Sequence, residues 1–157
     1  MLRKLLVAGA ALAMVAPASA VTVEVTQSEA FQEKLADDYG EREADVLARS
    51  LERRIEAAFE RDGVSADRVV VTIEDAKPNR PTFQQLSDRP GLDGIRSKSI
   101  GGAKVTGVAY DASGAQIGEL TYDWYETDIT MVIAGHTWHD ANWAFDRFAR
   151  KLARSLS

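Results

Sequence analysis

The chain has 157 residues, no cysteine and a formal net charge of −5 at pH 7. The absence of cysteine excludes disulfide bonds, so packing and hydrogen bonds have to stabilise the fold. The acidic balance argues against nucleic acid as a partner and against general adhesion to anionic membranes. The sequence has no internal repeat, and its length is typical of one domain.

Residues 1–20 have the composition of a secretory signal peptide. Arg3 and Lys4 give a basic start, an apolar run follows, and Pro17 precedes small residues that fit a cleavage site. The run is short for a membrane-spanning helix, and no cysteine follows it for a lipid anchor. We therefore expect a signal peptide at 1–20 and a single α+β domain at 21–157, periplasmic or secreted and without a transmembrane segment. Cleavage removes two cations and takes the charge from −5 to −7.

The first elements of the mature chain are predicted from two periodicities. Residues 21–26 alternate between valine and polar side chains, which predicts a half-buried strand. Thr26 and Glu29 have the spacing of a capping box, so a helix is expected to begin after Thr26. Gly40 is placed to end or bend that helix.

A long amphipathic helix is predicted over residues 41–61. Its apolar side chains recur at three- and four-residue spacing, and Gly63 stops the pattern. Residues 68–74 then read as a strand with apolar side chains on both faces, which indicates an interior position in the sheet. The apolar helix face consists of Ala44, Leu47, Leu51, Ile55, Ala58 and Phe59.

Residues 101–125 are predicted to form a β-hairpin around which the helices pack. Asp and Gly at the two ends of residues 111–114 are typical of a turn. A loop of these four residues pairs Val105 with Leu120 and separates an apolar face from a polar one. We expect Leu120 and Trp124 to face the helices.

The C-terminal third contains one apolar run and one helix. Residues 129–134 predict either a short strand or a buried connection, and periodicity does not decide between them. Thr137 and Asp140 resemble a capping box for the last helix. The apolar face of that helix consists of Ala141, Phe145, Phe148, Leu152 and Leu156.

Together these elements predict an α+β two-layer sandwich in the order β-α-α-β-loop-β-β-α. The sheet is expected to be mostly antiparallel with a central hairpin. The long helix and the C-terminal helix are expected to cover one face of it.

The connection at residues 76–100 is the candidate binding segment. It has five cations against two anions in an otherwise acidic chain, and long loops in small domains are often functional. Arg80, Arg89 and Arg96 can each bind a carboxylate or phosphate through a planar guanidinium. Phe83 adds apolar contact or anchors the loop to the core. The alternative is a solubilising loop whose charges offset the acidic body.

The histidines and carboxylates offer a weaker enzymatic hypothesis. His136 and His139 could present two metal ligands, with Asp128 or Asp140 as a third. The sequence lacks an HExxH pattern, a G-x-S-x-G elbow, a P-loop and a dinucleotide-binding motif. We therefore predict no cofactor and no tight transition-metal site, and the inventory of residues favours a protein that is not an enzyme.

Four segments carry a resemblance to a known group of proteins. They are PNRPTFQQLSDRPGLD, SIGGAKVTGVAYDASGAQIG, YDWYETDI and TWHDANWAFDRFARKLA. As a set they resemble a family of small exported proteobacterial proteins of unknown function. The resemblance runs from about Val69 to the C-terminus and implies no activity or binding site.

Three functional hypotheses follow. The first is a non-catalytic periplasmic binding or envelope-associated module that docks an anionic envelope component or protein through residues 76–100. The second is a small periplasmic hydrolase or metal-dependent enzyme using His136, His139 and nearby carboxylates. The third is a structural subunit of an oligomer, which would associate through the open sheet face around Val108, Tyr110 and Ile117. The identity of the partner and the oligomeric state stay open.

Overall fold

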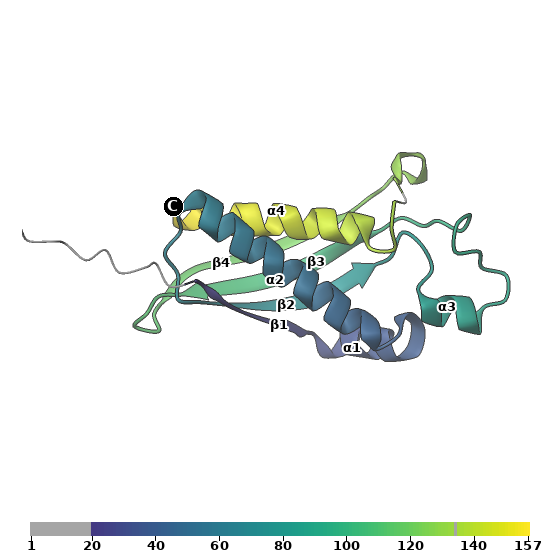
Figure 1. Ribbon diagram of the computed structural model, residues 1–157, viewed down its shortest axis with the longest axis horizontal. Helices are drawn as coiled ribbons and strands as arrows, with labels where there is room; N and C mark the ends of the chain where they lie inside the picture. The colour runs from purple at the N-terminus through teal and green to yellow at the C-terminus, as the bar shows by residue number, and fades with distance from the viewer. Residues whose placement is uncertain (1–19, 134) are drawn as a thin grey trace, which may run out of the picture.

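The structure is a computed structural model that describes residues 20–133 and 135–157 (Figure 1). The predicted signal peptide therefore lies, apart from Ala20, outside the described residues. Within them, no helix combines the length and the apolar character needed to cross a membrane.

A four-stranded sheet forms one layer of the fold. Its strands lie in the order β1-β2-β3-β4, with β1 parallel to β2 and the other pairs antiparallel. As predicted, the strand with apolar side chains on both faces, β2, is interior. The strands are β1 (Thr22–Gln27), β2 (Arg68–Lys77), β3 (Gly102–Tyr110) and β4 (Gln116–Tyr125).

The chain between the two parallel strands is helical. It contains α1 (Glu29–Lys34), a π-helical turn η1 (Leu35–Tyr39) and α2 (Arg42–Asp62). The expected cap at Thr26 is wrong. That residue stays in the β1 ladder, and the Ser28 hydroxyl instead accepts a hydrogen bond from the amide of Phe31 at 3.3 Å.

Helices α2 and α4 (His139–Leu156) form the second layer and cover one face of the sheet (Figure 1). The predicted apolar faces of both helices are confirmed, although Ala44 and Leu156 are only partly buried. The predicted α+β two-layer arrangement is therefore confirmed. The largest fully buried side chains are Phe31, Leu47, Leu51, Ile55, Phe59, Val69, Val71, Ile73, Val105, Phe145, Phe148 and Leu152.

The β3–β4 hairpin occurs, but in a different register and position from those predicted. Val105 pairs with Tyr122 instead of Leu120. The turn takes residues 111–115, and a further register shift lies beside Tyr110. Together, the longer turn and this shift move the pairing at Leu120 by two residues from the predicted register. Because side chains of a strand alternate between the two faces, a change of two leaves Leu120 facing the helices. The hairpin lies on one side of the sheet with β4 at the edge, because β1 adds to β2 and not to β4.

Two connections leave the same end of the sheet. Lys77 pairs with Gly102, and Gly102 pairs with Tyr125, so residues 78–101 and 126–138 begin or end at adjacent positions. The first connection contains α3 (Phe83–Asp88). A capping box between Thr82 and Gln85 begins this helix.

The second connection contradicts two expectations. Ile129–Met131 form a short 3₁₀ helix, η2, and Val132 after it is buried, so residues 129–133 form no strand and are buried only at Val132. Ala134 lies outside the described residues. The expected capping box at Thr137 is also wrong, because α4 begins at His139 and Asp140 turns toward the first connection instead.

Candidate functional site

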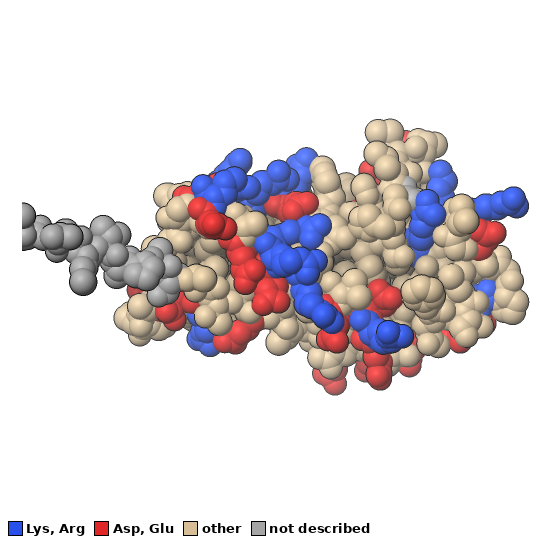
Figure 2. All heavy atoms as spheres, in the orientation of Figure 1, with Lys and Arg blue, Asp and Glu red and all other residues tan. Residues whose placement is uncertain are grey.

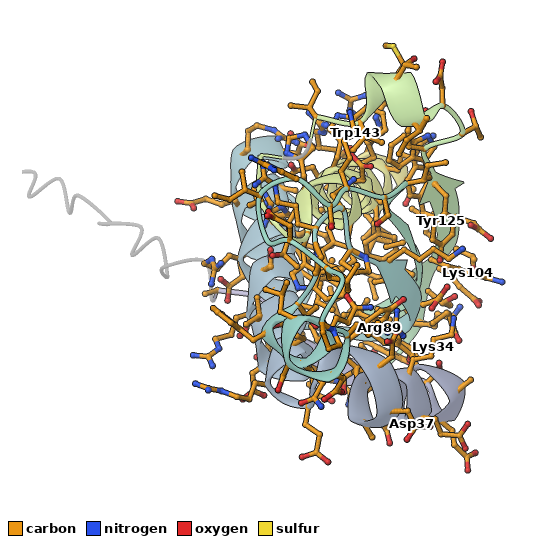
Figure 3. All side chains as sticks on the ribbon, turned by 90° about the vertical axis from the view of Figure 1, so that its right-hand side faces the viewer. Lys34, Asp37, Arg89, Lys104, Tyr125 and Trp143 are labelled. Carbon is orange, nitrogen blue, oxygen red and sulfur yellow. The ribbon has the colours of Figure 1, made fainter. Side chains whose placement is uncertain are left out.

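A pocket of about 270 Å³ lies at this end of the sheet, between residues 76–100 and η1. We call it the basic pocket. Figure 3 looks onto this end of the molecule, with Arg89 near the centre of the view. The pocket is lined by four cations and by Asp38, with apolar walls from Tyr39, Leu92 and three neighbouring residues. The four cations are Lys77, Arg80, Arg89 and Lys98, and the other apolar residues are Pro78, Pro81 and Ile100.

A buried polar network fixes both ends of the loop that forms the pocket. Asn79 is fully buried, and its amide nitrogen donates to the Asp140 carboxylate at 2.6 Å and to the Ser99 carbonyl at 3.2 Å. Its amide oxygen accepts from the backbone amide of Asp140 at 2.7 Å. The same carboxylate accepts from the Gly101 amide at 3.2 Å. The first turn of α4 therefore holds Asn79 and Gly101, some twenty residues apart in sequence, in one place.

Gly101 is required at its position by this network. A Cβ atom added there would lie 2.6 Å from the side-chain oxygen of Asn79. Asn79 is held by five hydrogen bonds, three through its side chain and two through its backbone with Thr137 and Ser99, so it cannot easily turn away. Any larger residue would therefore displace the wall of the basic pocket.

Asp38 connects α3 to η1 across the pocket. Its carboxylate forms an ion pair with Arg89 and accepts a hydrogen bond from the Gln85 amide at 3.0 Å. The charge of Arg89 is thus partly compensated inside the protein. Arg80 donates to the Gly94 carbonyl at 3.4 Å, so it contacts the far side of the loop.

Tyr39 forms an uncharged wall of the pocket. It is buried, and its ring lies edge-on to Trp138 with 5.6 Å between the centroids. Burial raises the pKa of Tyr39 to about 12, with further increases from Asp75 and Asp38 and an opposing effect from Arg89. The phenol therefore stays protonated at physiological pH and adds no negative charge to the pocket.

Two of the four predicted binding residues line the basic pocket, and two lie outside it. Arg80 and Arg89 line the pocket, whereas Arg96 and Phe83 do not. Lys77 and Lys98 do line it, and their part in the site was not anticipated. A signal for them was present in the sequence, because antiparallel pairing at the base of a loop brings its first and last residues together.

The two histidines lie close together without the other ligands that a metal site needs. Their ring centroids are 5.3 Å apart. Burial lowers the pKa of His136, with smaller contributions from His139 and Arg54. Asp140 is engaged in the loop network, and the Asp128 carboxylate accepts from the amide of Thr130. Over residues 20–133 and 135–157, no group of three His, Cys, Asp or Glu side chains is placed to hold a metal ion.

The sheet face opposite the helices is mostly polar. Val108 and Tyr110 lie on it, and the Arg68 guanidinium lies 4.8 Å from the centroid of the Tyr110 ring. A row of side chains of one kind crosses all four strands in the middle of this face. The row consists of Thr26, Thr72, Thr106 and Thr121.

Comparison with known proteins gives little further information. No protein-family model matches the sequence, and no curated protein is similar to it. Among solved structures, the chain is similar to a minor lipoprotein from Acinetobacter baumannii. The TM-score is 0.36 and the sequence identity is 15%, with 86% of this chain and 91% of that chain covered. At this TM-score the likeness supports no inference about function.

Proposed function

We propose that the protein is a non-catalytic envelope module that docks an anionic group in its basic pocket. The observation that carries this proposal is the convergence of Lys77, Arg80, Arg89 and Lys98 on one cavity of a net acidic chain. Like charges in one cavity repel each other, and a bound anion relieves that repulsion. Arginine and lysine both bind phosphate and carboxylate groups through charge-assisted hydrogen bonds.

The size and rigidity of the pocket favour a small anionic group. At about 270 Å³ it lies just below the range usual for sites that enclose a whole drug-sized ligand. One phosphate or carboxylate head fits this volume, with the rest of the ligand outside. Because Asn79 and Gly101 are held by α4, the loop is already ordered, and binding loses little conformational entropy.

Charge removal in the basic pocket is expected to weaken phosphate binding at least tenfold. We predict this for the double variant Arg80→Gln, Lys98→Gln, because a hydrogen bond to a charged group contributes about 1.5–3 kcal/mol. Inorganic phosphate is the probe, and its affinity is measured by NMR titration at low and moderate salt. The matched control is Arg150→Gln, Lys151→Gln on α4, which changes the net charge equally outside the pocket. An equal loss in both variants would mean that phosphate senses only the overall charge.

The proposed location is the periplasm, which requires removal of residues 1–20. We expect the N-terminal sequence of the exported protein to begin at Val21. The structure offers a place for the new α-ammonium group, because Val21 lines a second cavity whose wall carries several carboxylates. A chain recovered from the soluble fraction with Met1 intact would contradict both the processing and the location. The carboxylates are those of Glu56, Glu60, Asp67 and Asp111.

A further inference from the structure

Most of the exposed large apolar side chains gather at the end of the molecule that holds the basic pocket. Among the described residues, seven such side chains are exposed, and five of them belong to the two connections that leave this end of the sheet. Figure 1 shows η2 and the α3 loop projecting separately at this end. We call these five side chains the apolar tips. They are Phe83 (87% exposed), Ile95 (80%), Ile129 (43%), Met131 (65%) and Ile133 (69%).

Local hydrogen bonds hold the segments that carry the tips. The Asp93 carboxylate accepts from the amides of Ile95 and Arg96, each at 2.8 Å. The Asp128 carboxylate accepts from the amide of Thr130 at 2.8 Å and from its hydroxyl at 2.7 Å. Exposed apolar side chains on ordered turns remain in contact with water, and such surfaces commonly mark a binding site.

The cations and the carboxylates around the apolar tips differ in the contacts that they make within the protein. The side chains of Arg96 and Lys98 form no ion pair with any residue in the described ranges. Five carboxylates of this end accept hydrogen bonds from neighbouring groups. These carboxylates are Asp38, Asp88, Asp93, Glu126 and Asp128. In Figure 2 this right-hand end is mainly tan with scattered blue and red patches, and larger patches of both colours lie over the middle and left of the molecule.

We propose that this end of the protein docks on a bilayer that contains anionic phospholipid. The apolar tips enter the interfacial region, while Arg96, Lys98 and the basic pocket contact lipid phosphate groups. This inference rests on the proposed function, because it names lipid headgroups as the source of the anion. Apolar side chains flanked by Lys and Arg are typical of proteins that bind the surface of an anionic membrane. A protein interface usually packs against one continuous patch. The apolar tips lie on separate projections, and a deformable lipid surface can accommodate such an arrangement more easily.

The net negative charge of the protein is expected to restrict membrane binding to the end that carries the apolar tips. General adhesion to anionic lipid is disfavoured by the net charge of −7 that the chain carries without Arg3 and Lys4. Among the described residues, the end with the apolar tips brings Arg96 and Lys98 together with five of the seven exposed large apolar side chains. Binding is therefore expected to need both components and to weaken as salt rises, because the Debye length shortens to about 8 Å at physiological ionic strength.

Vesicle co-sedimentation tests this inference with a chain that begins at Val21. The core cluster uses residues from Val21 onward, so this chain keeps the described fold and lacks the apolar segment before it, which could bind lipid itself. The vesicles are phosphatidylcholine with or without phosphatidylglycerol. We expect binding to the vesicles with phosphatidylglycerol, and a loss of at least tenfold in the triple variant Phe83→Ser, Ile95→Ser, Met131→Ser.

The matched control is Val46→Ser, Ile117→Ser, which removes exposed apolar side chains on α2 and β4 outside both connections. It should bind vesicles like the unmodified chain, and both variants should keep its melting temperature. Equal binding of the triple variant, or equal binding to pure phosphatidylcholine, would overturn the inference. Binding of inorganic phosphate in the basic pocket without any vesicle binding would also overturn it, while leaving the proposed function in place.

Discussion

Replacement of Asn79 by alanine is expected to lower the free energy of unfolding by about 3–5 kcal/mol. The variant leaves the buried Asp140 carboxylate with only the Gly101 amide as a partner. It also removes the acceptor of the Asp140 amide and one donor to the Ser99 carbonyl. Each buried polar group that loses its partner costs about 1–3 kcal/mol, and a charged group costs more. Urea unfolding followed by circular dichroism measures the change.

The chain provides a matched control for this experiment. Asn142 is only partly buried and accepts one hydrogen bond from the Ser50 hydroxyl at 2.5 Å. Asn142→Ala should therefore cost about 0.5–1.5 kcal/mol. In Asn79→Ala, amide hydrogen exchange should also accelerate across residues 78–101, because α4 no longer holds that loop. A loss below about 1 kcal/mol for Asn79→Ala, or exchange unchanged in the loop, would show that the network does not fix the pocket.

The second large effect is expected at Phe148, whose ring packs against the backbone of β3. Phe148→Ala should cost about 3–5 kcal/mol, because the ring is fully buried and its removal leaves a cavity. A Cβ atom at Gly107 would lie 2.6 Å from the Phe148 ring, so Gly107→Ala should cost about 1–3 kcal/mol by overpacking. The double variant should lose less than the sum, since the new methyl group enters the vacated space.

Gly118→Ala serves as the comparison for this pair. Its added methyl group would meet the end of the Leu156 side chain at 2.5 Å. Leu156 is only partly buried on the last turn of α4, so it can move aside, and the expected cost is close to zero. Thermal unfolding of all four variants measures these differences. Strict additivity of Phe148→Ala and Gly107→Ala would contradict direct packing of the ring on the glycine.

The sequence predicts the helices of this protein better than its strand register. Apolar residues at three- and four-residue spacing identify the buried faces of α2 and α4, because this spacing matches the 3.6 residues per turn of a helix. The hairpin register depends on the length of a turn and on one shift beside Tyr110, and neither leaves a periodic trace. The cap of α1 shows a similar limit. Thr26 and Ser28 are both competent caps, and pairing of β1 with β2 through Gln27 selects Ser28.

The candidate site is predicted only in part, since it depends on contacts between distant segments. The excess of cations in residues 76–100 points to this loop, and two of the three selected arginines line the pocket. The Asn79–Asp140 network joins residues 61 positions apart and has no local pattern. The apolar run at 129–134 looks like core in the sequence. Of its described residues, 129–133, all but Val132 are exposed, because η2 projects from the end of the sheet, beyond the cover that α2 and α4 provide.

The parallel pairing of β1 with β2 bears on the timing of maturation. Thr22 pairs with Arg68, so the first strand has no partner until the polypeptide has been delivered at least as far as β2. For a chain that crosses a membrane N-terminus first, the stretch next to the cleavage site stays extended and accessible during that interval. Under the proposed export, a protease that acts after Ala20 would meet β1 before β2 has arrived to pair with it. Under that proposal, the strand order makes the N-terminal strand the one that waits longest for its partner.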